Sequence, residues 1–250
     1  MVVYREHPVP EALRPVIACG WTLTVSGAPV RGWRVLPDAQ IDLVASGGPV
    51  RLAGPASTVQ FADLEVGGVA GVRLRPGSSA ALLGIPAHAI RDAAPALAEL
   101  WPRDEAVARA DAVAADPAAA PEARLRALYV LLAGRLRDAG APDLLVRRAV
   151  ATVERSAPSV TALADAAGLT SRQLLRRFDA AVGLGPKKLQ RIVRLQRGLE
   201  AHRRTPDLPL AGLAATAGYA DQAHLTRDWA ALTGTTPAAL LASRRVTVAG

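Results

Sequence analysis

The sequence predicts an α+β protein in which a small antiparallel sheet or incomplete barrel, with helices, precedes an all-α region. Three observations predict this class: short apolar runs broken by turn residues near the N-terminus, a helical pattern after them, and one motif written twice near the C-terminus. A chain of 250 residues also fits two domains at roughly 150 residues each.

The first part, 18–75, is predicted to be rich in β-strands. Its apolar runs 19–25, 41–45 and 69–75 have strand-like composition or alternation. Glycine and proline, as in Gly54-Pro55, mark turns between them.

A helical part follows at 78–139. Four helices are expected within it: 78–83, 95–101, 103–115 and 121–139. The last carries a leucine stripe at helical spacing, made of Leu125, Leu128, Leu132 and Leu136. The stripe fits a hydrophobic core, or a seam between two copies of the chain. Residues 1–140 together are predicted to form a sensor or regulatory domain.

The C-terminal part contains a duplicated motif. Four residues recur fifty positions later, as Leu163, Ala164, Ala167 and Gly168 and then Leu213, Ala214, Ala217 and Gly218. Four more recur fifty-one positions later, as Phe178, Gly183, Pro186 and Leu189 and then Trp229, Gly234, Pro237 and Leu240. Such repetition indicates two copies of one structural unit.

Each copy is predicted to be a helix-turn-helix unit, the first over 160–182 and the second over 210–233. Gly168 and Gly218 end the first helix of each unit, because glycine adopts the left-handed conformation at little cost. Thr170 or Ser171 caps the next helix in the first unit, and Asp221 does so in the second.

The two units lie in a predicted domain, 141–250, that begins with a helix at 144–155. A helix at 187–202 joins them, and its sixteen residues span about 24 Å. That spacing suits two helices that enter successive major-groove segments, ~34 Å apart. The tail with Arg244 and Arg245 is expected to be loose.

The excess positive charge lies entirely in the duplicated part. Residues 155–250 hold fourteen basic and six acidic side chains, which accounts for the net charge of +8 of the whole chain. A neutral first part and a basic second part indicate a polyanionic partner such as nucleic acid.

Other classes of protein fit less well. No apolar run reaches the ~18 residues of a membrane span, and the N-terminus lacks the apolar segment of a signal peptide, so a cytoplasmic protein is expected. The single Cys19 gives neither a disulfide framework nor a cysteine zinc site. The histidines of the first part, His7 and His88, are not spaced as metal ligands. No cofactor and no catalytic residues are expected.

The tandem arrangement resembles the AraC-type (AraC/XylS) transcriptional regulators, whose DNA-binding region has two helix-turn-helix units joined by a long helix. The resemblance covers roughly 144–241. It rests on the repeated residues above, on Ser171, Leu174, Arg177 and Leu169 in the first unit, and on Tyr219, Ala223, His224, Leu225 and Arg227 in the second. The chain departs from the family at Trp229, where phenylalanine is usual.

Side chains that would contact DNA follow from the helical pattern. In the first unit Leu174, Leu175 and Phe178 are expected to point inward. The predicted DNA-binding residues are Ser171, Arg172, Gln173, Arg176, Arg177, Lys187, Arg191, Arg194, Gln222, His224 and Arg227. Arginine pairs with guanine and glutamine with adenine, which favours Gln173, Arg176, Gln222 and Arg227 as base readers, although any one arginine could contact phosphate instead. Lys187, Arg191, Arg194 and Arg197 are expected to form a basic stripe on the connecting helix, facing out.

The first part resembles the uncharacterised, loosely cupin-like domains that often precede this DNA-binding region. The resemblance rests on 34–43 and 72–77, and glycine is usual in the family where Ala39 stands. The charges here form either an ion-pair network at the rim of the sheet or an effector pocket with Trp33 as a wall. The candidate effector residues are Trp33, Arg34, Asp38, Asp42, Arg73 and Arg75.

These features predict a regulator that reads two adjacent segments of double-stranded DNA under control of a small-molecule effector or partner. RNA polymerase is a further candidate partner, no membrane is expected, and monomer and homodimer both remain open, as do activation and repression. The alternatives are a non-specific DNA-binding protein and an enzyme domain tethered to DNA.

Overall fold

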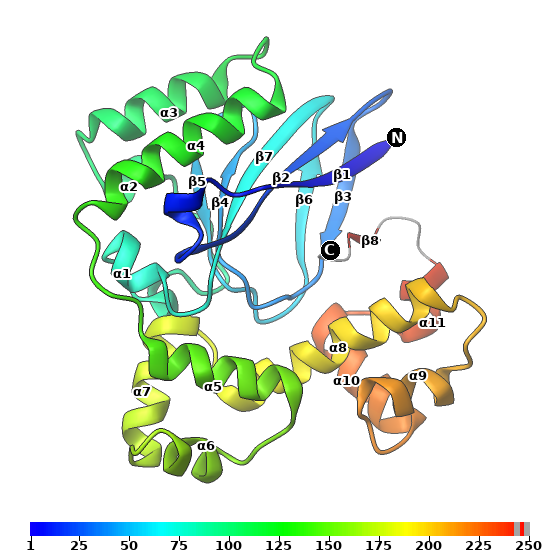
Figure 1. Cartoon of the computed structure of the whole chain (residues 1–250). Helices are drawn as coiled ribbons and strands as arrows, with labels where there is room; N and C mark the ends of the chain where they lie inside the picture. The colour runs from blue at the N-terminus through cyan, green and yellow to red at the C-terminus, as the bar shows by residue number, and fades with distance from the viewer. Residues whose placement is uncertain (243–245, 248–250) are drawn as a thin grey trace.

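The computed structural model describes residues 1–242 and 246–247. A β-rich part with helices on one side lies above a purely helical part (Figure 1), so the predicted α+β class is confirmed. Arg244 and Arg245 lie outside the described residues.

The larger sheet has five antiparallel strands in the order β1-β2-β7-β4-β5. Its centre consists of the three predicted strands, observed as β2 (Ile17–Val25), β7 (Gly67–Leu74) and β4 (Asp42–Ala45). At the edges lie β5 (Arg51–Ala53) and β1 (Val2–His7), which precedes the stretch where strands were expected. β1 forms because its whole length pairs with β2.

A smaller sheet has the order β6-β3-β8. β3 (Val30–Val35) pairs antiparallel with β6 (Gln60–Leu64), and on its other edge it pairs in parallel with β8 (Val246–Thr247). A segment close to the C-terminus therefore lies against the first part of the chain.

Four α-helices follow the last strand of the larger sheet: α1 (Ser79–Leu83), α2 (Leu97–Leu100), α3 (Glu105–Ala115) and α4 (Pro121–Leu136). α4 packs on β7 and β2. The close approach needs Gly20, since a Cβ atom there would lie 2.0 Å from the Tyr129 hydroxyl. Leu125, Leu128 and Leu132 are buried in this core, and Leu136 packs against it, so the stripe belongs to the core.

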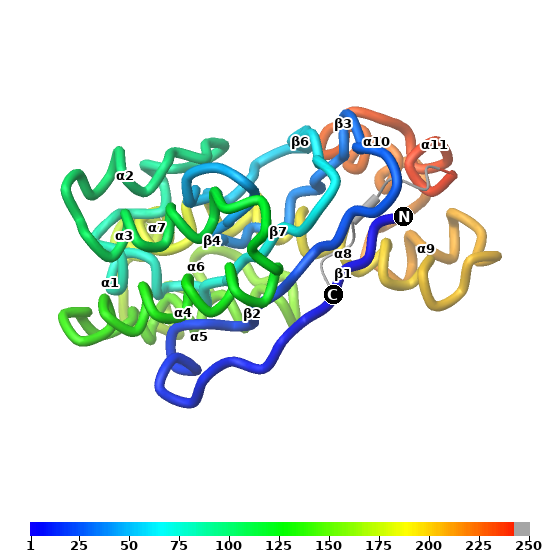
Figure 2. Tube along the Cα trace, turned by 90° about the horizontal axis from the view of Figure 1, so that it is seen from above, coloured from blue at the N-terminus to red at the C-terminus, as the bar shows by residue number. Residues whose placement is uncertain are grey.

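Seven helices form the C-terminal part: α5 (Leu144–Arg155), α6 (Val160–Ala166), α7 (Ser171–Val182), α8 (Pro186–Arg204), α9 (Leu210–Ala217), α10 (Gln222–Thr233) and α11 (Pro237–Ala242). Figure 2 shows α5, α6 and α7 at one end of α8 and α9, α10 and α11 at the other.

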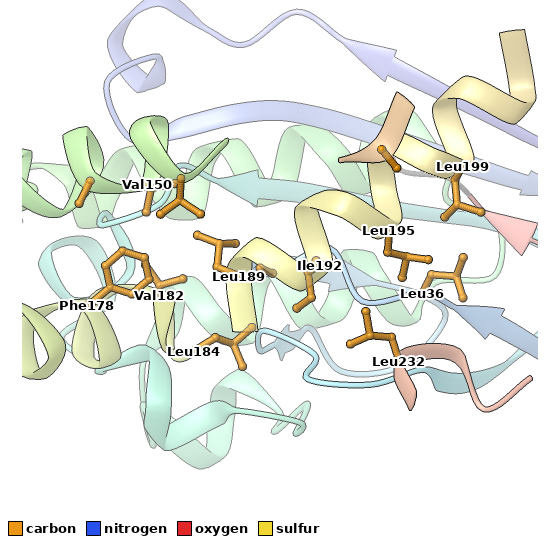
Figure 3. Close-up of a cluster of buried hydrophobic side chains, with 14 of the residues drawn as sticks. Leu36, Val150, Phe178, Val182, Leu184, Leu189, Ile192, Leu195, Leu199 and Leu232 are labelled. Carbon is orange, nitrogen blue, oxygen red and sulfur yellow. The ribbon is translucent and has the colours of Figure 1, made fainter. Parts of the chain in front are cut away.

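α8 forms the centre of this helical core. Its nineteen residues span about 28 Å, and Leu189, Ile192, Leu195 and Leu199 are buried along it (Figure 3). One end of this row meets Phe178 of α7, and the other meets helices of the second unit. The connecting helix is thus packed along its length, which fixes both units to it. In the described part of the chain, no helix combines the length and apolar character that crossing a membrane requires.

Candidate nucleic-acid interface

The first turn between helices has the predicted geometry. Gly168 adopts a left-handed φ of 65° just after α6. Thr170 rather than Ser171 caps α7: its hydroxyl accepts a hydrogen bond from the Gln173 backbone N–H at 3.2 Å, and the Gln173 side-chain oxygen accepts one from the Thr170 N–H at 2.9 Å. This reciprocal capping box fixes the start of α7.

The second turn repeats the arrangement. Gly218 follows α9 with a φ of 83°, and the Asp221 carboxylate accepts a hydrogen bond from the His224 backbone N–H at 2.6 Å. The prediction that Asp221 caps α10 is confirmed. A side-chain cap therefore fixes the N-terminus of the second helix in both units.

The outward surface of α7 is partly cationic and partly apolar. Arg172, Gln173 and Arg176 are exposed, and Ser171 is half-buried. Within the described residues, no ion pair or hydrogen bond engages the side chain of Arg172 or Arg176. These two guanidinium groups are free to meet an anion or a base edge, whereas the Gln173 side chain already serves the cap.

Leu175 lies outside, contrary to the expectation that it would point inward. Leu174 and Phe178 are fully buried, but Leu175 is 42% exposed. The buried face of α7 continues through Ala181 and Val182. Leu175 lies at the flank of that face, where its side chain stays in solvent.

Arg177 is not free, in contrast to the prediction. Its Nε donates to the carboxylate of Asp143 at 2.8 Å. Asp143 also caps α5, accepting from the Val146 N–H at 3.1 Å. Arg177 thus ties α7 to the start of α5, and its guanidinium is partly engaged before any DNA is present.

In the second unit, Gln222 and Arg227 are exposed on α10. His224 is half-buried, with its ring edge-on to Tyr219 at 5.2 Å between centroids. Leu225 and Trp229 are fully buried, as predicted. This surface has a single arginine, so it is less cationic than that of α7.

Two of the predicted stripe residues on α8 are half-buried and engaged by a carboxylate of the second unit. The Nε of Arg191 donates to Asp228 at 2.5 Å, and Arg194 lies 3.7 Å from the same carboxylate with its guanidinium over the Tyr219 ring. The Tyr219 hydroxyl donates to Asp228 at 3.0 Å, and burial raises the pKa of that phenol well above its usual range. A free outward stripe therefore does not form.

The rest of the stripe is divided. Arg197 donates to the Glu154 carbonyl of α5, whereas Lys187 is exposed at the start of α8. The stripe prediction failed because a carboxylate from the second unit, Asp228, faces α8. The repeat gives a hint of this role, since the offset of fifty-one makes Asp228 the counterpart of Arg177 in the second unit.

This correspondence exposes a reversal of charge. In the first unit an arginine, Arg177, reaches an aspartate that caps the preceding helix α5. In the second unit an aspartate, Asp228, reaches an arginine of the preceding helix α8. The same helical position therefore fastens each unit by an ion pair, with opposite polarity.

Three of the candidate effector residues come together where the loop before β4 meets β4 and β7 of the larger sheet. Arg73 lies 3.2 Å from Asp42 on the neighbouring strand and 3.3 Å from Asp38. Burial raises the pKa of Asp38, while the guanidinium of Arg73 opposes that shift. Ala39, next in the chain, adopts a left-handed φ of 60° where the family usually has glycine.

The other three candidates do not join this cluster. Trp33 is 8% exposed on β3 in the smaller sheet, and Arg34 lies over the Phe61 ring at 5.6 Å. Arg75 donates to the Arg14 carbonyl at 2.8 Å. The six residues therefore do not line one pocket, and the charged cluster has the form of an ion-pair network. In the described residues, no group of three or more His, Cys, Asp and Glu side chains is arranged to hold a metal ion.

The first part of the chain contacts the end of each second helix. Arg91 pairs with Asp179 at 2.5 Å and donates to the Gly183 carbonyl at the end of α7. The Val59 N–H donates to the Leu232 carbonyl near the end of α10 at 2.8 Å.

A third contact reaches the connecting helix. Gln196 of α8 donates to the Pro37 carbonyl at 2.8 Å. On either side of Pro37, Leu36 and Ala39 are buried in the C-terminal core. Sequence reasoning missed all of these contacts, because they join residues far apart in the chain.

Two family models match the chain. Residues 163–243 match the helix-turn-helix domain, and residues 5–95 match a domain of unknown function (DUF6597). None of the curated proteins matches the chain significantly.

Several solved structures are similar in part. The C-terminal domain of AraT, a response regulator from Geobacillus stearothermophilus, is 19% identical, with 42% of this chain and 89% of that chain covered and a TM-score of 0.38. ToxT from Vibrio cholerae O395 is 9% identical, with 95% and 96% covered and a TM-score of 0.45. Wild-type ToxT of strain SCE256 with an unsaturated fatty acid bound is 8% identical, with 96% and 94% covered and a TM-score of 0.45.

The duplicated turn geometry and the match to the helix-turn-helix domain agree on the character of the C-terminal part. The chain therefore carries an AraC-type helix-turn-helix domain, as DNA-binding transcription regulators do, and this domain follows a domain of unknown function.

Proposed function

We propose that this regulator is sequence-specific and cytoplasmic, and that α7 and α10 read two adjacent major-groove segments of one DNA site. The observation that carries the proposal is the pair of capped second helices, each with exposed arginine and glutamine side chains, fixed to the two ends of one packed helix. Side chains of these types pair with base edges. Arg172 and Arg176 carry most of the cationic surface, so the first unit contributes more to affinity than the second.

A non-specific DNA-binding protein is the main alternative. Such a protein needs cations spread over its surface for phosphates. Here several of the C-terminal cations, Arg177, Arg191 and Arg194, are paired with carboxylates. Of the exposed cations without an ion pair in the described residues, Arg172, Arg176 and Arg227 stand on the second helices, which favours reading of sequence, while Lys187 stands at the start of α8. An enzyme domain tethered to DNA has less support, because the Arg73 cluster of the first part has the form of an ion-pair network.

We further propose that a small polar effector acts at the cluster of Asp38, Asp42 and Arg73. Asp38 belongs to the same loop as Leu36, Pro37 and Ala39, which contact α8 and the C-terminal core. A ligand that competes for Arg73 would release the Asp38 carboxylate and so shift this loop. The contact with α8 would then change the placement of the two reading helices.

The reading role of α7 is tested by selecting binding sites from random DNA with the full chain and repeating the selection with Arg176→Ala. The variant should lose roughly 1–3 kcal/mol of binding free energy on the selected site and relax its preference at one base position. Affinities are measured at one stated salt concentration, because phosphate contacts depend steeply on salt. Arg126→Ala, an exposed arginine of α4, is the matched control and should leave binding unchanged.

An even loss of affinity across all sequences would contradict the assignment of Arg176 as a base reader. A selection that returns no preferred sequence would contradict sequence-specific binding altogether. The selected DNA sequence also indicates the oligomeric state. A monomer selects one asymmetric motif of two segments, whereas a dimer selects a repeated motif.

A further inference from the structure

Leu175 is unusual on this surface. In the described parts of the two helix-turn-helix units, it is the one large apolar side chain that is exposed, at 42%. Single exposed leucines are common on proteins, so the exposure alone would mean little. Its setting gives it meaning, because α7 is the helix whose outer surface carries the free arginines.

The neighbours of Leu175 on the outer side of the helix are polar or charged, and Phe178 lies buried on its inner side. Residues three or four apart lie side by side on a helix, which places Ser171 and Arg172 on one side of Leu175 and Asp179 on the other. Arg176 is adjacent in sequence. Arg172 and Arg176 are both exposed, and in the described residues neither has an ion-pair partner. A small apolar surface therefore borders two free guanidinium groups, at the edge of the exposed face of α7.

This pattern matches the edge of a base pair better than the surface of a protein. The major groove offers one apolar group, the 5-methyl of thymine, in a setting lined by phosphates and by guanine acceptors. If Leu175 packed against an apolar surface of a partner protein, the neighbouring arginines would lose their water without gaining a hydrogen-bond acceptor. That loss costs considerable free energy. In a groove both arginines find acceptors while the leucine finds a methyl group.

We propose that Leu175 contacts the 5-methyl group of a thymine in the DNA segment bound by the first unit. The proposal rests on the proposed reading of DNA by α7 and adds the chemical identity of one base. Leu175 then acts as a specificity-determining residue that distinguishes thymine from cytosine and from uracil at one position.

The second unit offers a different group at the corresponding position. The offset of fifty-one that relates Phe178 to Trp229 makes Thr226 the counterpart of Leu175 in the second unit. The Thr226 hydroxyl donates to the Gln222 carbonyl at 2.8 Å, and its side chain is half-buried. The two units therefore present unequal surfaces, and the two DNA segments of one site should differ.

The test uses deoxyuridine, which lacks the methyl group of thymidine. The full chain and Leu175→Ala are titrated with the selected site and with sites in which each thymine is replaced singly by deoxyuridine. One replacement should weaken binding of the full chain roughly fourfold, the value of one buried methyl. Leu175→Ala should lose a similar factor on the natural site and nothing more on that replaced site.

Val130→Ala is the control, since Val130 is 74% exposed on α4, in the first part of the chain; it should respond to deoxyuridine like the unaltered chain. Binding that is insensitive to every replacement would overturn the inference while leaving sequence-specific binding intact. A methyl effect of equal size in the chain and in Leu175→Ala would also overturn it, because another group would then read the methyl. Failure to select any site would overturn both this inference and the proposed function.

Discussion

Asp228 of α10 joins three side chains from two other elements, the connecting helix α8 and the turn before α10. Its carboxylate meets Arg191 and Arg194 of α8 and the hydroxyl of Tyr219 from the turn before α10, and it is 7% exposed. A buried carboxylate is retained only with partners that replace its water. Here the partners belong to separate elements, so the cluster sets where α10 sits on α8.

Removing that carboxylate should destabilise the protein. Asp228→Ala leaves two guanidinium groups and a phenol without their acceptor, and we expect the free energy of unfolding to fall by about 1–3 kcal/mol. The loss stays below that of a fully buried pair, because solvent screens Arg191, whose side chain is 36% exposed. Urea unfolding measures the change, and Asp207→Ala, an exposed aspartate, should stay within about 0.5 kcal/mol of the unaltered chain. Equal stability of both variants would contradict a structural role for the cluster.

Cys19 illustrates how the sheet controls reactivity. It lies opposite Arg73 in the strand pairing, with its thiol 3.7 Å from the Glu6 carboxylate. Burial raises the pKa of the Cys19 thiol to about 11, and the negative charge of Glu6 adds to the shift while Arg73 opposes it.

Because the thiolate is the reactive form, Cys19 should react slowly in the folded protein. At pH 8 alkylation should be roughly a hundredfold slower in the folded chain than in the same chain unfolded in urea, since the pKa lies about two units higher. The rate should rise with pH up to about 11 in the folded state. A rate profile that levels off near pH 9 in the folded chain would contradict the shift. Because Cys19 is the single cysteine, the measured alkylation rate belongs to this thiol alone.

At the scale of elements, α7 is held at both ends. Thr170 caps its start, and Gly183 ends it with a left-handed φ of 75°. A Cβ atom at Gly183 would lie 2.5 Å from Pro55 and 2.9 Å from the Ala87 carbonyl. The end of α7 therefore needs glycine twice, for the conformation and for the contact with the first part of the chain.

Two alanine substitutions separate these requirements. Gly168→Ala meets the same conformational cost at a φ of 65°, but a Cβ there meets no other atom within 4 Å. It should cost about 1 kcal/mol of unfolding free energy. Gly183→Ala should cost at least about 1 kcal/mol more, because it also forces Pro55 and Ala87 away. Similar losses for the two variants, measured by urea unfolding, would show that the contact contributes nothing.

The elements themselves were the part most open to prediction. The period of apolar residues and the glycine signals gave the three central strands and both helix pairs, because these depend on local sequence. The Asp221 cap followed from the same local rules, which left Thr170 and Ser171 as alternatives for the first cap. The failures involve long-range partners. Arg191 and Arg194 looked free because Asp228 lies more than thirty residues away in the chain, and Leu175 looked buried because its helical position borders the buried face.

At the scale of the whole molecule, the first part of the chain contacts both units and the helix between them. Arg91 holds the end of α7, Val59 reaches the end of α10, and Pro37 contacts α8. None of these contacts is visible in sequence spacing. Together they join α7, α8 and α10 to the loops of the first part.

Weakening one contact should loosen one unit alone. In Arg91→Ala, amide hydrogen exchange at residues 179–183 should speed up roughly fivefold, the effect of losing about 1 kcal/mol from a half-exposed ion pair and its hydrogen bond. Exchange in α10 should not change. Arg126→Ala is again the control. Acceleration in both units alike would contradict separate contacts and indicate general destabilisation instead.

The opposite polarity of the two fastening ion pairs has a consequence during folding. The pairs are Arg177 with Asp143 and Asp228 with Arg191. The two repeats are alike enough in their apolar residues that either could dock on the other's anchor helix. If α10 met the start of α5, two aspartates would face each other, and if α7 met α8, arginine would face arginine. Repulsion of this kind disfavours the wrong assembly, so each copy of the repeat should dock on its own partner helix.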